Sequence, residues 1–281
     1  MIRAIEIAAL GWASLILAGC NEPASKAMWD NVKIGDLAPT KPGPGDQQIK
    51  TANIDVHIYE APAENVGKLE DVWESLYTRA VRFYSYQAFA GNLFRVGFGK
   101  RFGWSGTEGL LRAAGGKRMA KIALLLPDGQ PQDITVTGLN RPEELSYIDK
   151  ELSREKAVIG PGVMSLRVTA QKLAGERGVC EVIGCPVFSM PMRSPIEPLT
   201  EPLTERARRQ EVKFTGAGFG LKMSPDDFVV LGPQKYLSER VTLAGLFFSN
   251  LDGTVFLSKR RPPERKISVR VFVLVCTGIN Y

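Results

Sequence analysis

Hydrophobic and polar residues alternate along several short segments of the chain, and a period of two predicts β-strands with one buried face. The pattern is clear at 54–59, where every second residue is Ile or Val, and we expect a half-buried strand there. It recurs at 165–170, and a turn at 175–178 leads into a second strand segment at 179–183. These two segments predict a hairpin.

The segment 267–276 differs from the others because it is apolar on both faces. A strand of this kind must be covered twice, so we expect it in the centre of its sheet or between a sheet and a helix. Shorter apolar runs predict further strands near Val212, at Phe228–Leu231 and at Val255–Leu257.

Two segments of the chain's middle part are assigned by their turns and polarity. The apolar run 122–126 is followed by Asp128-Gly129 and by 134–137, which predicts a hairpin or a bent strand pair. Residues 140–157 are polar and charged, so we expect a surface loop with a helical turn.

Helical spacing of apolar residues appears once over a long segment. After Pro62, apolar side chains from Val66 to Val81 recur every three or four residues and predict one amphipathic helix with a buried stripe. Ser105 and Glu108 have the spacing of a capping box, and Gly115 suits a C-terminal cap, so a short helix is expected at 106–114. The predicted fold class is therefore α+β and β-rich, a mainly antiparallel sheet with one longer and one short helix.

Proline and glycine divide the chain into regions. Residues 20–48 contain few large apolar residues and several prolines and glycines, and we expect a flexible tether there. Residues 186–210 hold five prolines and a doubled Glu-Pro-Leu-Thr sequence, which predicts an exposed loop that interrupts the sheet of the domain 49–281.

The N-terminal residues have the pattern of a bacterial lipoprotein signal. Arg3 precedes an apolar run that is too short to span a bilayer as a helix, and the run ends in Leu-Ala-Gly-Cys20. We therefore expect residues 1–19 to be a signal peptide and Cys20 to carry the lipid. The alternative is an ordinary signal peptide with a chance cysteine, since Glu6 is unusual in such a segment. By resemblance to lipoproteins, Asn21 favours the outer membrane, facing the periplasm.

The composition is typical of a globular domain with a basic surface. Of the 281 residues, 44% are hydrophobic and 23% are charged, and the net charge is +6. In an exported protein this charge suits anionic lipid headgroups or cell-wall polymers, or it is only a solvated basic surface, and no nucleic-acid partner is expected. With Cys20 lipidated, Cys180, Cys185 and Cys276 remain, so either one is unpaired or all three are free.

The sequence offers little catalytic chemistry. Its single histidine, His57, stands on the polar face of a predicted strand, where a structural role is the usual one. The glycines between 91 and 106 miss the dinucleotide-binding spacing, and we find no nucleophile elbow, zinc motif or phosphate loop. We therefore expect no enzyme, no cofactor and no metal site.

The order of features resembles the secretin homology domain, the family that forms the rings of outer-membrane secretion channels. The likeness covers residues 49–281 and begins with the strand 54–60 and the helix that contains Trp73. The other similar segments are 110–129, 163–188, 226–232, 243–248 and 269–280.

This chain departs from the family at the Pro-x-x-Gly signature, which is replaced by Val241-Thr-Leu-Ala-Gly245, and it has only the tether where most secretins have ring-building domains. The resemblance implies a lipid-anchored envelope protein with a structural or assembly role, as a homo-oligomer or in an envelope complex.

A second hypothesis is a monomeric envelope binding module for an anionic polymer or a protein partner. Its binding residues would be cations interleaved with aromatic rings, which can neutralise and stack on a ligand. The alternative for this segment is a packed loop that lines the sheet. The residues are Arg95, Lys100, Arg101, Phe102 and Trp104.

Overall fold

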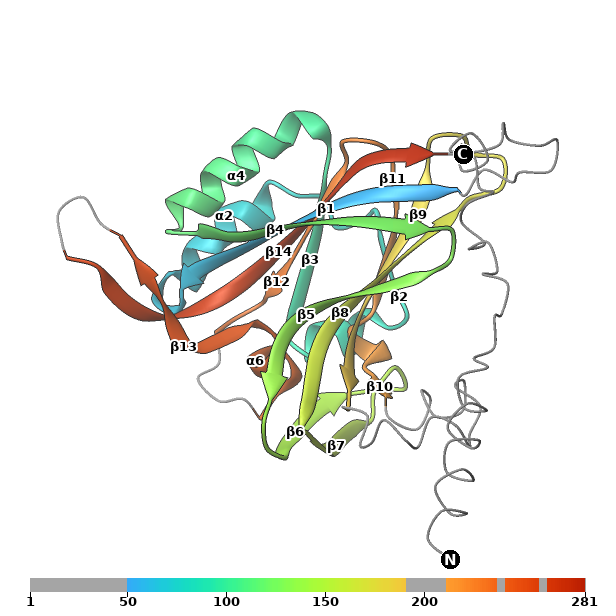
Figure 1. The fold of residues 1–281 in the computed structure, drawn as a ribbon. Coiled ribbons are helices and arrows are strands. Elements are labelled where there is room, and N and C mark those ends of the chain that lie inside the picture. Colours follow the sequence, from blue (N-terminus) through green and yellow to red (C-terminus); the bar gives the residue numbers. More distant parts are fainter. Residues whose placement is uncertain (1–49, 191–210, 237–240, 258–261, 281) are drawn as a thin grey trace, which may run out of the picture. The chain divides into compact units, whose positions relative to one another are not determined.

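The computed structural model describes residues 50–190, 211–236, 241–257 and 262–280, all of which belong to one compact unit. Two antiparallel sheets dominate this unit, and the few helices are short, so the predicted α+β, β-rich class is confirmed (Figure 1). The expected signal peptide, the tether and most of the proline-rich loop lie outside the described residues.

Sheet A has the order β3-β12-β14-β1-β4, with β13 paired to β14. Its middle strand, β14, is the segment that was predicted to be central because both its faces are apolar, and this prediction is confirmed. The strands are β1 (Thr51–Pro62), β3 (Phe94–Gly99), β4 (Lys117–Pro127), β12 (Phe228–Pro233), β13 (Ser249–Phe256) and β14 (Glu264–Asn280).

Sheet B has the order β2-β11-β9-β8-β5, with β10 paired to β9. The predicted hairpin at 165–183 is confirmed, since β8 and β9 pair in antiparallel register over their whole lengths. The strands are β2 (Val81–Phe83), β5 (Pro131–Leu139), β8 (Gly162–Lys172), β9 (Cys180–Ser189), β10 (Glu211–Lys213) and β11 (Phe219–Met223).

Two hydrophobic cores lie on the two faces of sheet A. Phe272 and Leu274 of β14 point into the core that sheet A shares with sheet B. Val271 and Val273, on the opposite face, pack with Trp73 and other residues beneath the helices α2 and α4 (Figure 1). The alternation of β14 therefore serves two cores, which explains why no polar face is visible in its sequence.

The helix expected after Pro62 is much shorter than predicted. The chain forms a 3₁₀ helix and one turn of α-helix, and then Tyr77 exchanges two backbone hydrogen bonds of 2.8 Å with Phe98 while Val81 enters β2. Pairing with distant strands thus replaces the helical bonds that the apolar period indicated. The helical segments in this region are η3 (Ala63–Leu69) and α2 (Glu70–Glu74).

The short helix near residue 110 exists, but its start differs from the prediction. It begins at Trp104 without a side-chain cap, and Glu108 instead accepts hydrogen bonds from Tyr59 and Arg112. Gly115 has a positive φ of 82° just after the helix, as expected of a C-terminal glycine. The remaining helices are α3 (Tyr86–Gly91), η4 (Arg101–Gly103), α4 (Trp104–Ala113), η6 (Thr215–Ala217) and α6 (Leu243–Phe248).

The predicted pairing of residues 122–126 with 134–137 is wrong. These segments are β4 and β5, which pair with β1 in sheet A and with β8 in sheet B. The turn at Asp128-Gly129 connects the sheets, where the amide of Gly129 donates to the carbonyl of Ala170 at 2.8 Å. The segment 140–157 is likewise not a loop, because β6 (Glu143–Ile148) and β7 (Arg154–Ile159) form a two-stranded hairpin.

The proline-rich interruption begins later than the predicted residue 186. Pro186 lies within β9 and stands opposite Leu166 of β8. On the other side of β9, the neighbouring strand changes at this point from β11, which pairs with 180–184, to β10, which pairs with 187–189. A proline, which has no amide hydrogen to donate, is tolerated where the pairing is interrupted.

Candidate interaction surface

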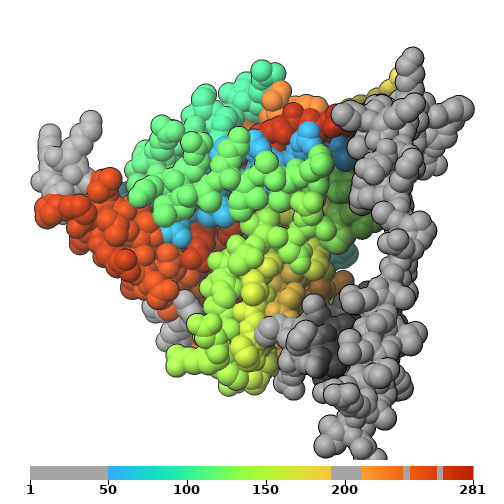
Figure 2. Space-filling view, in the orientation of Figure 1, coloured from blue at the N-terminus to red at the C-terminus, as the bar shows by residue number. Residues whose placement is uncertain are grey.

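A hairpin formed by β13 and the first residues of β14 extends beyond the other strands of sheet A (Figure 1 and Figure 2), and its Lys266 pairs with Glu64 of η3 at 2.6 Å. Val255 pairs with Arg265, so the alternation of the strands places Val255, Arg265 and Ile267 on one face. Val255 is 39% exposed and Ile267 46%, and Leu257, just beyond β13, is 76% exposed. We call these four residues the hairpin face.

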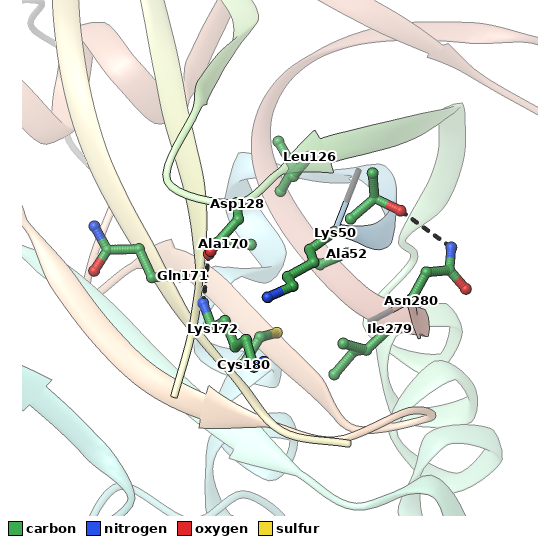
Figure 3. A pocket seen from close by; sticks show the side chains of 11 residues that line it. Lys50, Ala52, Leu126, Asp128, Ala170, Gln171, Lys172, Cys180, Ile279 and Asn280 are labelled. Carbon is green, nitrogen blue, oxygen red and sulfur yellow. Dashed lines mark hydrogen bonds between the residues drawn. The ribbon is translucent and has the colours of Figure 1, made fainter. Parts of the chain in front are cut away.

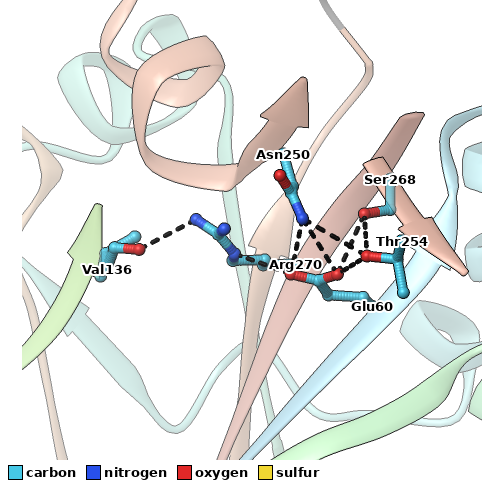
Figure 4. A network of polar contacts seen from close by, with 6 residues as sticks. All are labelled: Glu60, Val136, Asn250, Thr254, Ser268 and Arg270. Carbon is cyan, nitrogen blue, oxygen red and sulfur yellow. Dashed lines mark hydrogen bonds and ion pairs between the residues drawn. The ribbon is translucent and has the colours of Figure 1, made fainter. Parts of the chain in front are cut away.

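The opposite side of the hairpin is held to the sheet by a buried polar cluster (Figure 4). The carboxylate of Glu60, on β1, accepts from Arg270 Nε at 3.0 Å and from Ser268 Oγ at 3.1 Å. It also accepts from the Thr254 hydroxyl and, at 3.2 Å, from the amide of Asn250, both on β13. The cluster therefore joins β1, β13 and β14 through one carboxylate.

Arg270 extends the cluster to the second sheet, since its Nη1 donates to the carbonyl of Val136 on β5 at 2.9 Å. Burial alone would raise the pKa of Glu60, but the hydrogen bonds from Thr254, Arg270 and Asn250 outweigh burial and hold this pKa below its ordinary value. Glu60 is therefore ionised at neutral pH. The sequence analysis missed this cluster, although Arg270 is the one charged residue in the apolar segment 267–276.

A pocket lies at the opposite end of the two sheets (Figure 3). Its walls come from both sheets, with Ala52 from sheet A and Ala170 and Cys180 from sheet B, and the side chains of Lys50 and Lys172 lie at it. The amide of Lys172 donates to Asp128 at 2.7 Å, so the β4–β5 turn holds the two sheets together beside the pocket.

Most of the five predicted partner-binding residues are engaged within the molecule, and Arg95, near the start of β3, is separated by the length of that strand from the other four, which follow its end. Arg95 pairs with Glu70 and lies over the Trp73 ring, Lys100 pairs with Asp227 at 2.9 Å, and Arg101 pairs with Asp226 at 2.9 Å. Trp104 packs on Phe228, whereas Phe102 is 82% exposed. A role of these residues in binding an anionic partner stays a prediction.

His57 does not lie on a polar face, because helix α4 covers that side of β1. Its ring is 8% exposed and packs 5.5 Å from the Trp104 ring, and its Nδ1 has no hydrogen-bond partner among the described residues. Burial, with Arg118 and Lys121 nearby, lowers the pKa of His57, and Asp55 and Glu108 partly oppose this. His57 is thus a neutral, buried side chain at pH 7.

The remaining predictions concern the lipidated cysteine, metal binding and membrane-spanning segments. Cys20 lies outside the described residues. In the ranges that the structure describes, no three His, Cys, Asp or Glu side chains are gathered as a metal site would need, and no helix is both long and apolar enough to cross a membrane.

No protein-family model matches the chain, and no curated protein matches it. Among solved structures, it is similar to the InvG secretin domain β-barrel from the Salmonella SPI-1 injectisome, with 9% sequence identity and a TM-score of 0.25. The alignment covers 84% of this chain, which spans about 65% of the length of that chain. At this TM-score the likeness carries no conclusion about the fold or the function of this chain.

Proposed function

We propose that this chain is a lipid-anchored protein of a bacterial cell envelope that assembles with other copies of itself through the hairpin face and has a structural role. The hairpin face carries the proposal, because it presents exposed aliphatic side chains on a hairpin that extends beyond the other strands of sheet A (Figure 2). The proposal assigns no catalytic step to the chain.

The hairpin is suited to assembly because its position is fixed before any partner binds. The buried cluster around Glu60 orders both of its strands, so little conformational entropy remains to be lost on association. Covering the hairpin face removes apolar surface from water, which is worth roughly 25 cal/mol per Å². A second copy that buries this surface would therefore stabilise an oligomer.

The membrane anchor in the proposal is supported by the Leu-Ala-Gly-Cys20 sequence after an apolar run. Several acyl chains on one cysteine hold a protein on a membrane where a single chain gives reversible binding. Cys20→Ala should leave an unprocessed protein that takes up no labelled palmitate. Labelling of this variant at the level of the unchanged chain would contradict the anchor and leave the assembly proposal standing.

The assembly is tested by the size of the full-length protein in mild detergent, measured by size exclusion with light scattering. We expect a species several times larger than 30.8 kDa, the mass of one chain. Leu257→Asp should reduce it to a monomer with an unchanged Tm, since Leu257 is exposed and its replacement disturbs no core. Val158→Asp, at a 70% exposed position of β7, is the matched control and should keep the large species. A monomeric unchanged chain would overturn the assembly role.

A further inference from the structure

Two cysteines that are far apart in the sequence meet between the sheets. Cys180 begins β9 of sheet B and Cys276 lies near the end of β14 in sheet A, and both belong to the core between the sheets. Both are free thiols in this structure and both are almost fully buried. Their side chains hydrogen-bond to each other.

The backbone independently requires the two cysteines to be close. Met223 of β11 stands opposite Cys180 in the sheet register. Three residues later, the amide of Asp226 donates to the carbonyl of Cys276 at 2.6 Å, and the amide of Cys276 donates to Asp227 at 2.9 Å. Three residues of extended chain span at most about 10 Å. The β11–β12 turn thus keeps the start of β9 and the end of β14, which carry the two thiols, in the same region of the core.

We propose that Cys180 and Cys276 form a disulfide bond that links sheet A to sheet B. Two thiols that hydrogen-bond to each other lie close enough for a small rearrangement to bring them to bonding geometry. The bond would join the two large sheets at the end opposite the hairpin face, where no buried ion pair connects them among the described residues.

Cys185 is excluded as the partner of either residue by its position on β9. It is five residues from Cys180, so its side chain points to the other face of sheet B. It lies near Arg167, Lys213 and Glu211, and burial raises the pKa of Cys185 to about 11. The bond therefore has one pairing, and Cys185 serves as an internal control.

The oxidant is a disulfide, either of a protein or of a small molecule such as oxidised glutathione. Cys180 loses its proton, and its thiolate attacks one sulfur of this disulfide, which stays bonded to Cys180 as a mixed disulfide. The other sulfur leaves as a thiolate and takes up the proton, which gives the first released thiol. Cys276 then loses its proton and attacks the Cys180 sulfur, which releases the second thiol. Two protein thiols are oxidised and one disulfide is reduced to two thiols.

Both thiols are buried, but Cys180 lines the pocket at this end of the sheets and Cys276 does not (Figure 3). A local opening of this pocket would therefore expose Cys180 to an oxidant before Cys276. The hydrogen bond with Cys276 lowers the pKa of Cys180 and raises the pKa of Cys276. The position of Cys180 at the pocket and its lowered pKa both favour Cys180 as the attacking thiol. Cys276 then attacks the mixed disulfide and completes the bond.

The test uses the full chain, exported by a bacterial host, purified without reductant and then incubated with oxidised glutathione. After unfolding in the presence of iodoacetamide, mass spectrometry should find Cys185 alkylated and the peptides of Cys180 and Cys276 linked until dithiothreitol is added. The linked protein should have a Tm about 5–10 °C higher than the reduced protein. Alkylation of both Cys180 and Cys276 after the glutathione step would overturn the proposal.

Two variants keep the result specific. Cys185→Ser should retain the linked peptides and the dithiothreitol-sensitive Tm. Cys276→Ser should lose both, and the alkylation of its Cys180 can be read even if this variant is unstable. Linkage of Cys180 to Cys185 in the unchanged chain would also contradict the proposal. The bond is independent of the assembly proposal, because monomeric protein can be examined in the same way.

Discussion

At the scale of single residues, His57 makes the stability of the protein depend on pH. The pKa of His57 is lowered from 6.5 in the folded protein, so the unfolded chain binds more protons as the pH falls below about 6.5. The free energy of unfolding should therefore decrease from pH 7.5 to 5.5, by at most about 1.4 kcal/mol per pH unit. Urea unfolding at the two pH values measures this loss.

The sequence contains a single histidine, which makes the assignment of this effect direct. His57→Gln removes the titrating group at similar size and should flatten the pH dependence between 7.5 and 5.5. The interpretation is wrong if the unchanged chain and His57→Gln lose the same stability over this range. The sequence predicted a structural histidine, but not its burial, because the cover of β1 by α4 is a contact between distant segments.

Glu60 carries the second prediction at the residue scale. Glu60→Gln leaves the Arg270 guanidinium buried without its anion, and loss of one partner of a buried pair costs about 3–5 kcal/mol. Thermal or urea unfolding at pH 7 should show this loss. The matched control is Glu64→Gln, which removes the exposed partner of Lys266 and should change stability little.

Glu60 affects the free energy of unfolding at a lower pH than His57 does, and in the same direction. The folded pKa of Glu60 lies below 4.5, so its contribution to stability is present above pH 4.5 and disappears as the pH falls through the folded pKa. Glu60→Gln should therefore be less sensitive to acid than the unchanged chain below pH 4.5. Equal acid sensitivity of the two proteins would contradict the role given to this carboxylate.

At the scale of elements, the sequence predicts strands better than it predicts their partners. The β8–β9 hairpin was predictable because the two strands are adjacent in sequence and joined by a glycine turn. The pairing of β4 was not, because the residues of its partner β1 lie 57 to 76 positions earlier, and no local pattern records which edge a strand will join. The same limit applies to the cluster that fixes the hairpin, in which Glu60 and Arg270 are 210 residues apart.

The position of β14 gives a prediction for an element. Val273 is fully buried and stands opposite His57 of β1 and Val230 of β12, so an aspartate there would be an unpaired charge in the core. Val273→Asp should cost several kcal/mol, which is a large part of a domain's stability, and yield insoluble protein. Leu125→Asp, at a 56% exposed position on the edge strand β4, is the control and should stay soluble. A soluble Val273→Asp protein with unchanged Tm would show that β14 is not central.

At the scale of the whole molecule, the prolines between 191 and 210 predict a site of proteolytic cleavage after which the two fragments stay associated. Proline disfavours sheet pairing because it has no amide hydrogen to donate, so limited proteolysis should cleave first near Leu199 to Arg209. The strands on either side pair with each other, since Glu211 of β10 stands opposite Ser189 of β9, and both fragments contribute strands to sheets A and B. The two fragments should therefore elute together in size exclusion and separate only in denaturant. A first cut within 51–81 would contradict this division of the chain, because it would mean that β1 and the adjoining helices open more readily than the proline-rich segment.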